Sequence, residues 1–214
     1  MNWLSKKNMD QALDTQIPTE NPVDAADKIL LAALKLFAEK GYFNTSLSDI
    51  ANAAELCSLS AVYQHFNHKQ AIAAKLYEYI LDSLSVSIDD IRRKNPKPSE
   101  QLHGIVDLFF KLTDDAPYVM QFLLNLRSNE FLTDVKPLQE MPAFVKITKI
   151  VQSGIRAGEI RSIDPLLATT YFFGVINNTL RMVLAGQLEK KAEAYQPQTW
   201  LAAWSVIAKR PNGF

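Results

Sequence analysis

Apolar side chains recur at steps of three and four residues along most of this chain from Pro22 onward, which is the spacing of an amphipathic helix. The first such helix carries Ile29, Ala33 and Phe37 on one face and ends at Gly41, where we expect the left-handed backbone that follows many helices. No stretch alternates apolar and polar residues for long enough to build a sheet. The pattern therefore predicts an all-α protein.

A helix of about two turns is predicted next. Thr45 or Ser46 supplies the N-cap, and the spacing of Ser46 and Asp49 fits a capping box. Leu47 and Ile50 form its apolar side.

A break over residues 55–58 separates this helix from another short one, in which Val62 and Phe66 share a face at a spacing of four residues. Two short helices beside a longer one indicate a helix-turn-helix module of three helices. A long helix over residues 69–93 then links the module to a larger helical part and stops before two prolines.

Further helices are predicted over residues 99–113, 116–129, 137–157, 165–188 and 197–209. The sequence thus predicts a mobile N-terminal arm (1–21), a helix-turn-helix domain (22–68) and a larger helical domain (69–214) that begins with the linking helix.

Composition narrows the class of protein. The 23 basic and 23 acidic residues balance, so no global positive field attracts nucleic acid or a membrane surface. The single Cys57 has no partner for an internal disulfide, and the first twenty residues lack the apolar run of a signal peptide. No stretch reaches the length of a membrane span. We therefore expect a cytoplasmic protein with no membrane segment.

The stretch SAVYQHFNHKQA, residues 60–71, carries the most distinctive chemistry. If Val62 points into the module, helical geometry turns Ser60, Tyr63, Gln64 and, at the edge, His65 outward. All four side chains can donate to phosphate oxygens, and glutamine can also pair with adenine. Lys69 adds a cation at the start of the next helix.

Three other interpretations of this stretch require features that can be checked in the sequence. A zinc site is disfavoured because His65 and His68 lie on either side of a helix break. A nucleophilic site is disfavoured because no carboxylate lies between Glu55 and Glu78 to orient a base. A solvated helix whose aromatic residue only packs remains the plain alternative. We expect no catalytic site, no metal and no cofactor.

The run ILLAALKLFAEKGYFNTSLSDIANAA followed by SAVYQHFNHKQAI resembles the DNA-binding domain of the tetracycline-repressor (TetR) family of transcriptional regulators, over about residues 25–76. A weaker similarity to the family's C-terminal domain covers residues 150–177. The resemblance implies an all-helical homodimer that places its third helix in the DNA major groove. It implies that bases are faced by Ser60, Ala61 and Gln64, and that phosphates are held by Tyr63, His65, Lys69 and the cap at Thr45 or Ser46.

Two features depart from the family pattern. One extra residue stands between Ile50 and Tyr63, and Glu55-Leu56-Cys57 replaces the expected turn glycine. The module from residue 22 to residue 77 also carries five lysines and five acidic residues, so its net charge is zero. Because phosphate neutralisation dominates non-specific affinity, we expect weak binding to bulk DNA and a shallow salt dependence.

Aromatic residues are frequent on the helices after residue 95. Packing of a core explains any single one of them, while the resemblance implies a pocket for a small, largely apolar effector. The candidate effector-binding residues are Phe109, Gln121, Phe122, Asn125, Phe144, Phe172 and Asn177, with Arg127 as a further polar candidate.

The last two long helices carry more apolar surface than the ends of a monomer usually need. In the family that the chain resembles, these helices form a four-helix interface between subunits. The candidate dimer residues are Phe173, Leu180, Val183, Leu184, Trp200 and Trp204.

The leading functional prediction is a ligand-responsive regulator, a repressor that leaves a palindromic operator when a small effector binds. The alternative is a protein of the same shape that binds ligands or partners and has little DNA affinity, because its module is neutral. An enzyme is disfavoured by the absence of a nucleophile, base and orienting acid in one pattern.

Overall fold

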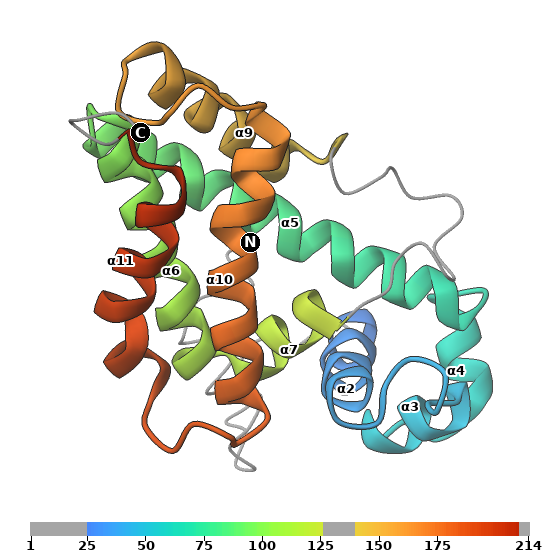
Figure 1. The fold of residues 1–214 in the computed structure, drawn as a ribbon. Coiled ribbons are helices and arrows are strands. Elements are labelled where there is room, and N and C mark those ends of the chain that lie inside the picture. The colour runs from blue at the N-terminus through green and yellow to red at the C-terminus, as the bar shows by residue number, and fades with distance from the viewer. Residues whose placement is uncertain (1–24, 126–139, 210–214) are drawn as a thin grey trace. The chain divides into compact units, whose positions relative to one another are not determined.

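The computed structural model describes residues 25–125 and 140–209 (Figure 1). Within these ranges every regular element is a helix, and the only β-type contact is an isolated bridge between Ile160 and Ala208. The all-α prediction is confirmed. The predicted arm, residues 1–21, and Arg127 lie outside the described residues. No helix of the described ranges combines the length and apolar composition that a membrane span requires.

The chain divides into two compact units. The first comprises residues 1–83 and 118–136, and the second comprises residues 84–117 and 137–214. The boundary between the units falls inside a continuous helix, α5 (Lys69–Lys94). The boundary after residue 68, where the sequence predicts that the helix-turn-helix domain ends and the larger helical domain begins, stays a prediction.

The first unit begins with α2 (Ala25–Lys40), whose inward face includes Ile29, Ala33 and Phe37 as predicted. Gly41 ends the helix with a φ of 82°, so the expected left-handed conformation is confirmed. The two short helices are α3 (Leu47–Ala53) and α4 (Leu59–Tyr63).

Helix α7 (Pro117–Asn125) adds an apolar cover to the first unit. The ring of Phe122 stacks on that of Phe37 with 6.1 Å between centroids. The hydroxyl of Tyr118 donates to Glu39 at 2.8 Å, and this hydrogen bond raises the pKa of Tyr118. Helix α7 is therefore tied to α2 by packing and by one polar contact.

The second unit consists of the end of α5 and four further α-helices, with α10 and α11 side by side (Figure 1). These are α6 (Pro98–Asp115), α9 (Pro142–Arg156), α10 (Pro165–Leu184) and α11 (Gln196–Ile207), with the short 3-10 helix η2 (Ala192–Tyr195) before α11. Asp164 caps α10 by accepting from Leu167 N–H at 2.9 Å. The helix predicted to reach residue 188 ends at Leu184, because Gly186 takes a left-handed φ of 69°.

Helices and turns of the second unit approach closely at glycine positions, of which Gly154 is one. A Cβ added at Gly154 on α9 would lie 2.7 Å from Ile160 Cδ1. Because Ile160 is 1% exposed and held in the bridge to Ala208, that side chain has little room to move. Gly158, in the turn that follows α9, has a φ of 75°.

Candidate nucleic-acid interface

Helix α4 presents two different faces. Val62 is 0% exposed and anchors the helix in the first unit, whereas Tyr63 is 50% exposed. Ser60, Gln64 and His65 are exposed as well. The predicted division into an anchored side and a polar side is therefore present in the structure, which excludes the burial of Tyr63 or Gln64.

The start of α3 lies in the same unit and has a firm cap. Ser46 accepts from Asp49 N–H through its Oγ at 3.1 Å, and Asp49 Oδ2 accepts from Ser46 N–H at 2.8 Å. The predicted capping box is confirmed. The hydroxyl of Ser46 also donates to Asp49 Oδ2 at 2.6 Å, and the two hydrogen bonds that this carboxylate accepts from the side chain and backbone of Ser46 hold the pKa of Asp49 below its usual value.

The sequence offered either Thr45 or Ser46 as the N-cap of α3, and the structure gives the two residues different roles. Thr45 is 1% exposed, and its hydroxyl donates to the carbonyl of Gly41 at 2.9 Å. Ser46 is exposed and is the N-cap. Of the two, Ser46 is the side chain that an external phosphate can reach.

Lys69 forms hydrogen bonds within the first unit. Its Nζ donates to the carbonyls of Tyr42 and Thr45, each at 2.7 Å, and lies 4.3 Å from the centre of the Tyr42 ring. Burial lowers the pKa of Lys69 and raises that of Tyr42. An ammonium has three donors, so these bonds leave one for another acceptor. The lysine therefore joins the start of α5 to the turn before α3.

Two aromatic and imidazole side chains near this surface were not in the predicted set. Phe43 is 67% exposed in the turn before α3, and its ring meets the ring of Tyr42 edge-on at 5.3 Å. His68 is exposed and accepts from Ala71 N–H at 3.0 Å through Nδ1. An aromatic residue in a turn shortly before a helix cap is the sequence signal by which Phe43 could have been found.

In the turn between α3 and α4, where the family pattern has a glycine, a residue other than glycine takes the left-handed conformation. Glu55 has a φ of 55°, and it is the only residue other than glycine with a positive φ among those described. Its N–H donates to Asn52 O at 3.1 Å, and Leu56 N–H donates to Ala51 O at 3.0 Å. The chain thus makes the left-handed turn with a glutamate, which holds α4 at the cost of backbone strain.

The cations of the first unit are partly neutralised. Lys75 pairs with Glu78 at 2.9 Å, and this hydrogen bond raises the pKa of Lys75. Lys28, Lys35 and Lys40 are exposed. Weak electrostatic attraction for DNA stays a prediction, which rests on the zero net charge of the module.

The predicted effector-binding residues are split between the units. Gln121, Phe122 and Asn125 belong to the first, where Phe122 is buried against Phe37 and Asn125 is exposed. The other four lie in the second unit: Phe109, Phe144, Phe172 and Asn177.

Within the second unit the aromatic candidates form a chain of contacts. The Phe173 ring lies 5.8 Å from that of Phe109 and 5.1 Å from that of Phe172. Phe172 is fully buried and meets Trp200 at 5.9 Å. Asn177 Oδ1 is buried and accepts no hydrogen bond from any described residue. An acceptor of this kind marks a place where a ligand donor gains a hydrogen bond.

The predicted dimer residues differ in the surface that they offer. Leu180 is 0% and Phe173 is 8% exposed, so both pack within their own unit. Val183, Leu184, Trp200 and Trp204 are half-buried. Further apolar surface on α10 and α11 comes from Leu166, Leu167, Tyr171, Met182 and Leu201, all at least 37% exposed.

Metal-ligating side chains do not cluster in the described ranges: no group of three His, Cys, Asp or Glu residues there could hold an ion. Cys57 is exposed and forms no disulfide. The chemistry of this surface is that of hydrogen-bond donors on a short helix.

Comparison with known proteins agrees with this geometry. Residues 29–76 match the family model described as "Bacterial regulatory proteins, tetR family". The chain is 25% identical over 156 residues to the fatty acid metabolism regulator protein of Bacillus subtilis, covering 72% of this chain and 80% of the relative. It is 33% identical over 78 residues to the HTH-type transcriptional repressor KstR2 of Mycobacterium tuberculosis, covering 36% of this chain and 38% of that repressor.

Solved structures share the fold. The crystal structure of the transcriptional regulator FadR from Bacillus subtilis in complex with stearoyl-CoA matches with a TM-score of 0.65 at 21% identity. The match covers 83% of this chain and 97% of that one. Both the helix-turn-helix part and the larger helical part therefore have counterparts among known regulators.

Proposed function

The chain belongs to the TetR family of bacterial transcriptional regulators, and on this premise we propose that it is a repressor that binds a palindromic operator as a homodimer and leaves it when a small effector binds. The observation that carries the proposal is the exposed face of α4. Val62 fixes the helix from inside, while Tyr63 and Gln64 face outward and are free of intramolecular roles in holding the fold.

The proposed contacts follow from the exposure of each side chain. Ser60, Ala61 and Gln64 face the bases, and glutamine can pair with an adenine in two places at once. Tyr63 and His65 reach the phosphates on either side of the groove.

Phosphate contacts also come from the neighbouring elements. Ser46 is exposed at the start of α3, and its hydroxyl donates to Asp49 Oδ2 at 2.6 Å, so a contact with phosphate requires this hydroxyl to turn away from the carboxylate. Lys69 contributes its remaining donor, and Thr45 contributes by holding the turn rather than through its own hydroxyl. Specificity then depends on the placement of hydrogen bonds, because the net charge of the module is zero.

The direction of control and the effector are supported by relatives. KstR2 carries the name of a transcriptional repressor, and FadR of Bacillus subtilis was crystallised with stearoyl-CoA. The buried Oδ1 of Asn177 and the aromatic side chains around Phe172 suit a largely apolar ligand with one hydrogen-bond donor. Phe109 and Phe144, both half-buried, complete the candidate set in the second unit.

Dimerisation is proposed through α10 and α11. Leu167, Tyr171, Gly174 and Met182 follow one another at helical spacing on α10, and a Cβ added at Gly174 would meet nothing within 4 Å. A small residue in the middle of an apolar stripe lets a second helix approach closely. In this division of labour residues 22–68 bind DNA and residues 69–214 bind the effector and the second subunit.

The test is a binding titration with DNA from the region upstream of the protein's own gene. Wild-type protein should shift a saturable band that resists unrelated competitor DNA. Gln64→Ala and Tyr63→Ala should each weaken binding by about 1–3 kcal/mol, since each removes a contact to base or phosphate. Gln187→Ala, an exposed glutamine of the second unit, is the matched control and should leave the affinity unchanged.

The salt dependence of the same titration separates the two candidate functions. The logarithm of the affinity should fall by about one unit per tenfold salt for each phosphate-contacting cation. The zero net charge of the module favours a second candidate, an interaction protein of helix-turn-helix origin with little DNA affinity. Absence of saturable binding even at low salt would support that candidate and refute the repressor.

A further inference from the structure

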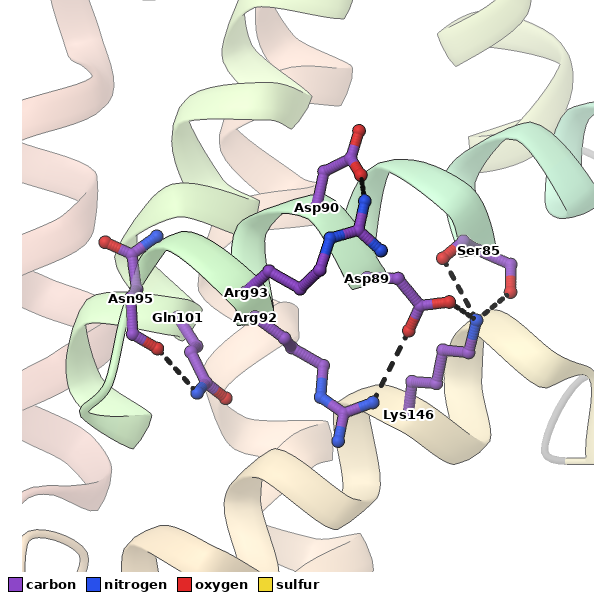
Figure 2. Close-up of polar contacts among 8 residues, drawn as sticks. All are labelled: Ser85, Asp89, Asp90, Arg92, Arg93, Asn95, Gln101 and Lys146. Atoms are coloured by element: carbon purple, nitrogen blue, oxygen red, sulfur yellow. Dashed lines mark hydrogen bonds and ion pairs between the residues drawn. The ribbon is translucent and has the colours of Figure 1, made fainter.

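A pocket of about 480 Å³ opens in the second unit where α5 ends and α6 begins. Its walls come from three helices: Arg92 and Arg93 on α5, Gln101 on α6, and Lys149 and Ser153 on α9. Figure 2 shows the side chains at the α5 end of this region. None of the predicted effector-binding or DNA-binding residues lines the pocket.

The charge of the lining is positive. Arg92, Arg93 and Lys149 carry three positive charges, and Asp89 carries the one negative charge, which leaves a net charge of +2. A second pocket of about 390 Å³ in the same unit is lined by Glu100 and Asp107 and lacks any lysine or arginine. An anion would therefore choose the first pocket over the second.

Two of the three cations of the pocket, Arg92 and Lys149, are available to a ligand, whereas Arg93 is paired with Asp90 on the same helix (Figure 2). Arg92 reaches Asp89 only at 3.4 Å, with both side chains about two-fifths exposed, and exposed pairs of this kind contribute little to stability. Asp89 has a closer partner in Lys146 Nζ at 2.5 Å, and this hydrogen bond holds the pKa of Asp89 below its usual value. Lys149 is exposed and forms no ion pair with any described residue.

The scaffold behind these cations is fixed. Lys146 Nζ also donates to the carbonyl of Ser85 at 3.1 Å and to its hydroxyl at 2.6 Å, which joins α9 to α5 (Figure 2). Gln101 Nε2 donates to Asn95 O at 2.9 Å, which joins α6 to the end of α5. The three walls are thus held in place before any ligand arrives, which lowers the entropy cost of binding.

The rest of the lining suits the organic part of a ligand. Pro96, Pro98 and Ile150 supply apolar surface, and Ile150 is itself 2% exposed. Ser153 Oγ accepts from Arg156 at 3.2 Å, which leaves its hydroxyl proton to donate outward. Cations beside apolar walls describe a ligand that carries a charged group on a carbon skeleton.

We propose that this pocket binds the phosphate group of a small organic phosphate ester. A phosphate monoester carries a charge of about −1.5 to −2 at pH 7, which matches the net charge of the lining. Guanidinium groups fit phosphate oxygens through paired hydrogen bonds, and Arg92 offers this fork in the pocket that Lys149 also lines. The test of this site does not depend on the proposed repressor function, because binding of the phosphate ester is measured without DNA.

The experiment is calorimetric titration of the full chain with phenyl phosphate at constant ionic strength. Saturable binding is expected with a Kd of about 1 mM or tighter, which is ordinary for a ligand of this size. Arg92→Gln combined with Lys149→Gln should weaken binding by at least about tenfold, because charge-assisted bonds to phosphate are lost. Phenol, which lacks the phosphate, should not bind.

The matched control is Lys190→Gln combined with Lys191→Gln, which removes two exposed charges of the same unit outside the pocket. This variant should keep the wild-type affinity within about twofold. Equal losses in both variants would show general attraction of anions and overturn the site, as would a wild-type protein that does not saturate. The charge-conserving variant Arg92→Lys with Lys149→Arg changes the same two positions and should retain binding. Loss of binding in this variant as well would mean that the substitutions disturb the fold of the pocket.

Discussion

The two units hold themselves together in different ways. In the first unit polar side chains bond to nearby backbone: Ser46 and Asp49 cap α3, and Lys69 bridges two carbonyls before it. In the second unit the corresponding work is done by aromatic packing, in which Phe172 lies between Phe173 and Trp200. The cap of α3 in the first unit thus uses hydrogen bonds between residues three positions apart, beside the longer-range bonds of Lys69, whereas Phe172 and Trp200 in the second unit join two helices by ring contact alone.

This difference explains where the chain is similar to its relatives. Local caps and turns need particular residue types at fixed spacing, so a family model matches over residues 29–76. A packed core accepts many apolar combinations of similar volume, and the likeness beyond the module is carried mainly by the fold. The family model thus matches the part of the chain that is rich in local caps and turns.

The largest effect of a mutation is expected on the exposed apolar surface of α10 and α11 in the second unit. Tyr171 is 42% exposed and Leu201 is 65% exposed on the two helices that we assign to the dimer. Tyr171→Glu combined with Leu201→Glu should halve the mass measured by light scattering, because two carboxylates would be buried without partners. Operator binding should then fall by at least about a hundredfold, since one subunit reads only half of a palindrome.

Gln152→Glu, on the exposed side of α9, is the control for added charge and should leave the dimer intact. A double variant that keeps the wild-type mass would remove α10 and α11 from the interface. Because both mutated side chains are already exposed, the isolated subunit should remain folded by circular dichroism.

Sequence reasoning was strongest in the first unit. The end of α2 at Gly41, the capping box and the burial of Val62 all follow from local rules, and each is confirmed. It was weaker wherever a side chain's partner is distant in sequence. Lys69 and Tyr42 lie 27 positions apart, and nothing in the sequence indicated that this lysine bonds inside its own unit.

The same limit applies to the second unit. Leu180 and Leu184 both belong to the apolar side of α10, but only the packing of neighbouring helices decides that Leu180 is 0% exposed. The basic pocket was not predicted, because Arg92 and Lys149 lie 57 positions apart and only the fold brings them to one opening. Helix existence is readable from periodicity, whereas the face that each residue occupies against a partner helix is not.

An intermediate effect is expected at the turn before α4, where the local rules of the first unit are broken. Glu55 holds a φ of 55° that glycine adopts without strain. Glu55→Gly should raise the free energy of unfolding by about 1 kcal/mol, measured by urea denaturation. Glu55→Gln keeps the strained backbone and removes only the charge, so an equal gain in that variant would assign the effect to electrostatics instead.

The smallest effect should come from the cap of α3, and it depends on pH. The folded-state pKa of Asp49 lies below its ordinary value of 3.8, because Ser46 donates two hydrogen bonds to the carboxylate. The stabilisation is therefore complete above the unfolded-state pKa and is lost as the pH falls through the folded-state pKa. Asp49→Asn keeps the shape and the acceptor without the charge. Thermal unfolding should place the variant below wild type at about pH 6, with the gap closing toward about pH 3. A gap that stays constant over this range would mean that the charge of Asp49 contributes nothing to the stability of the first unit.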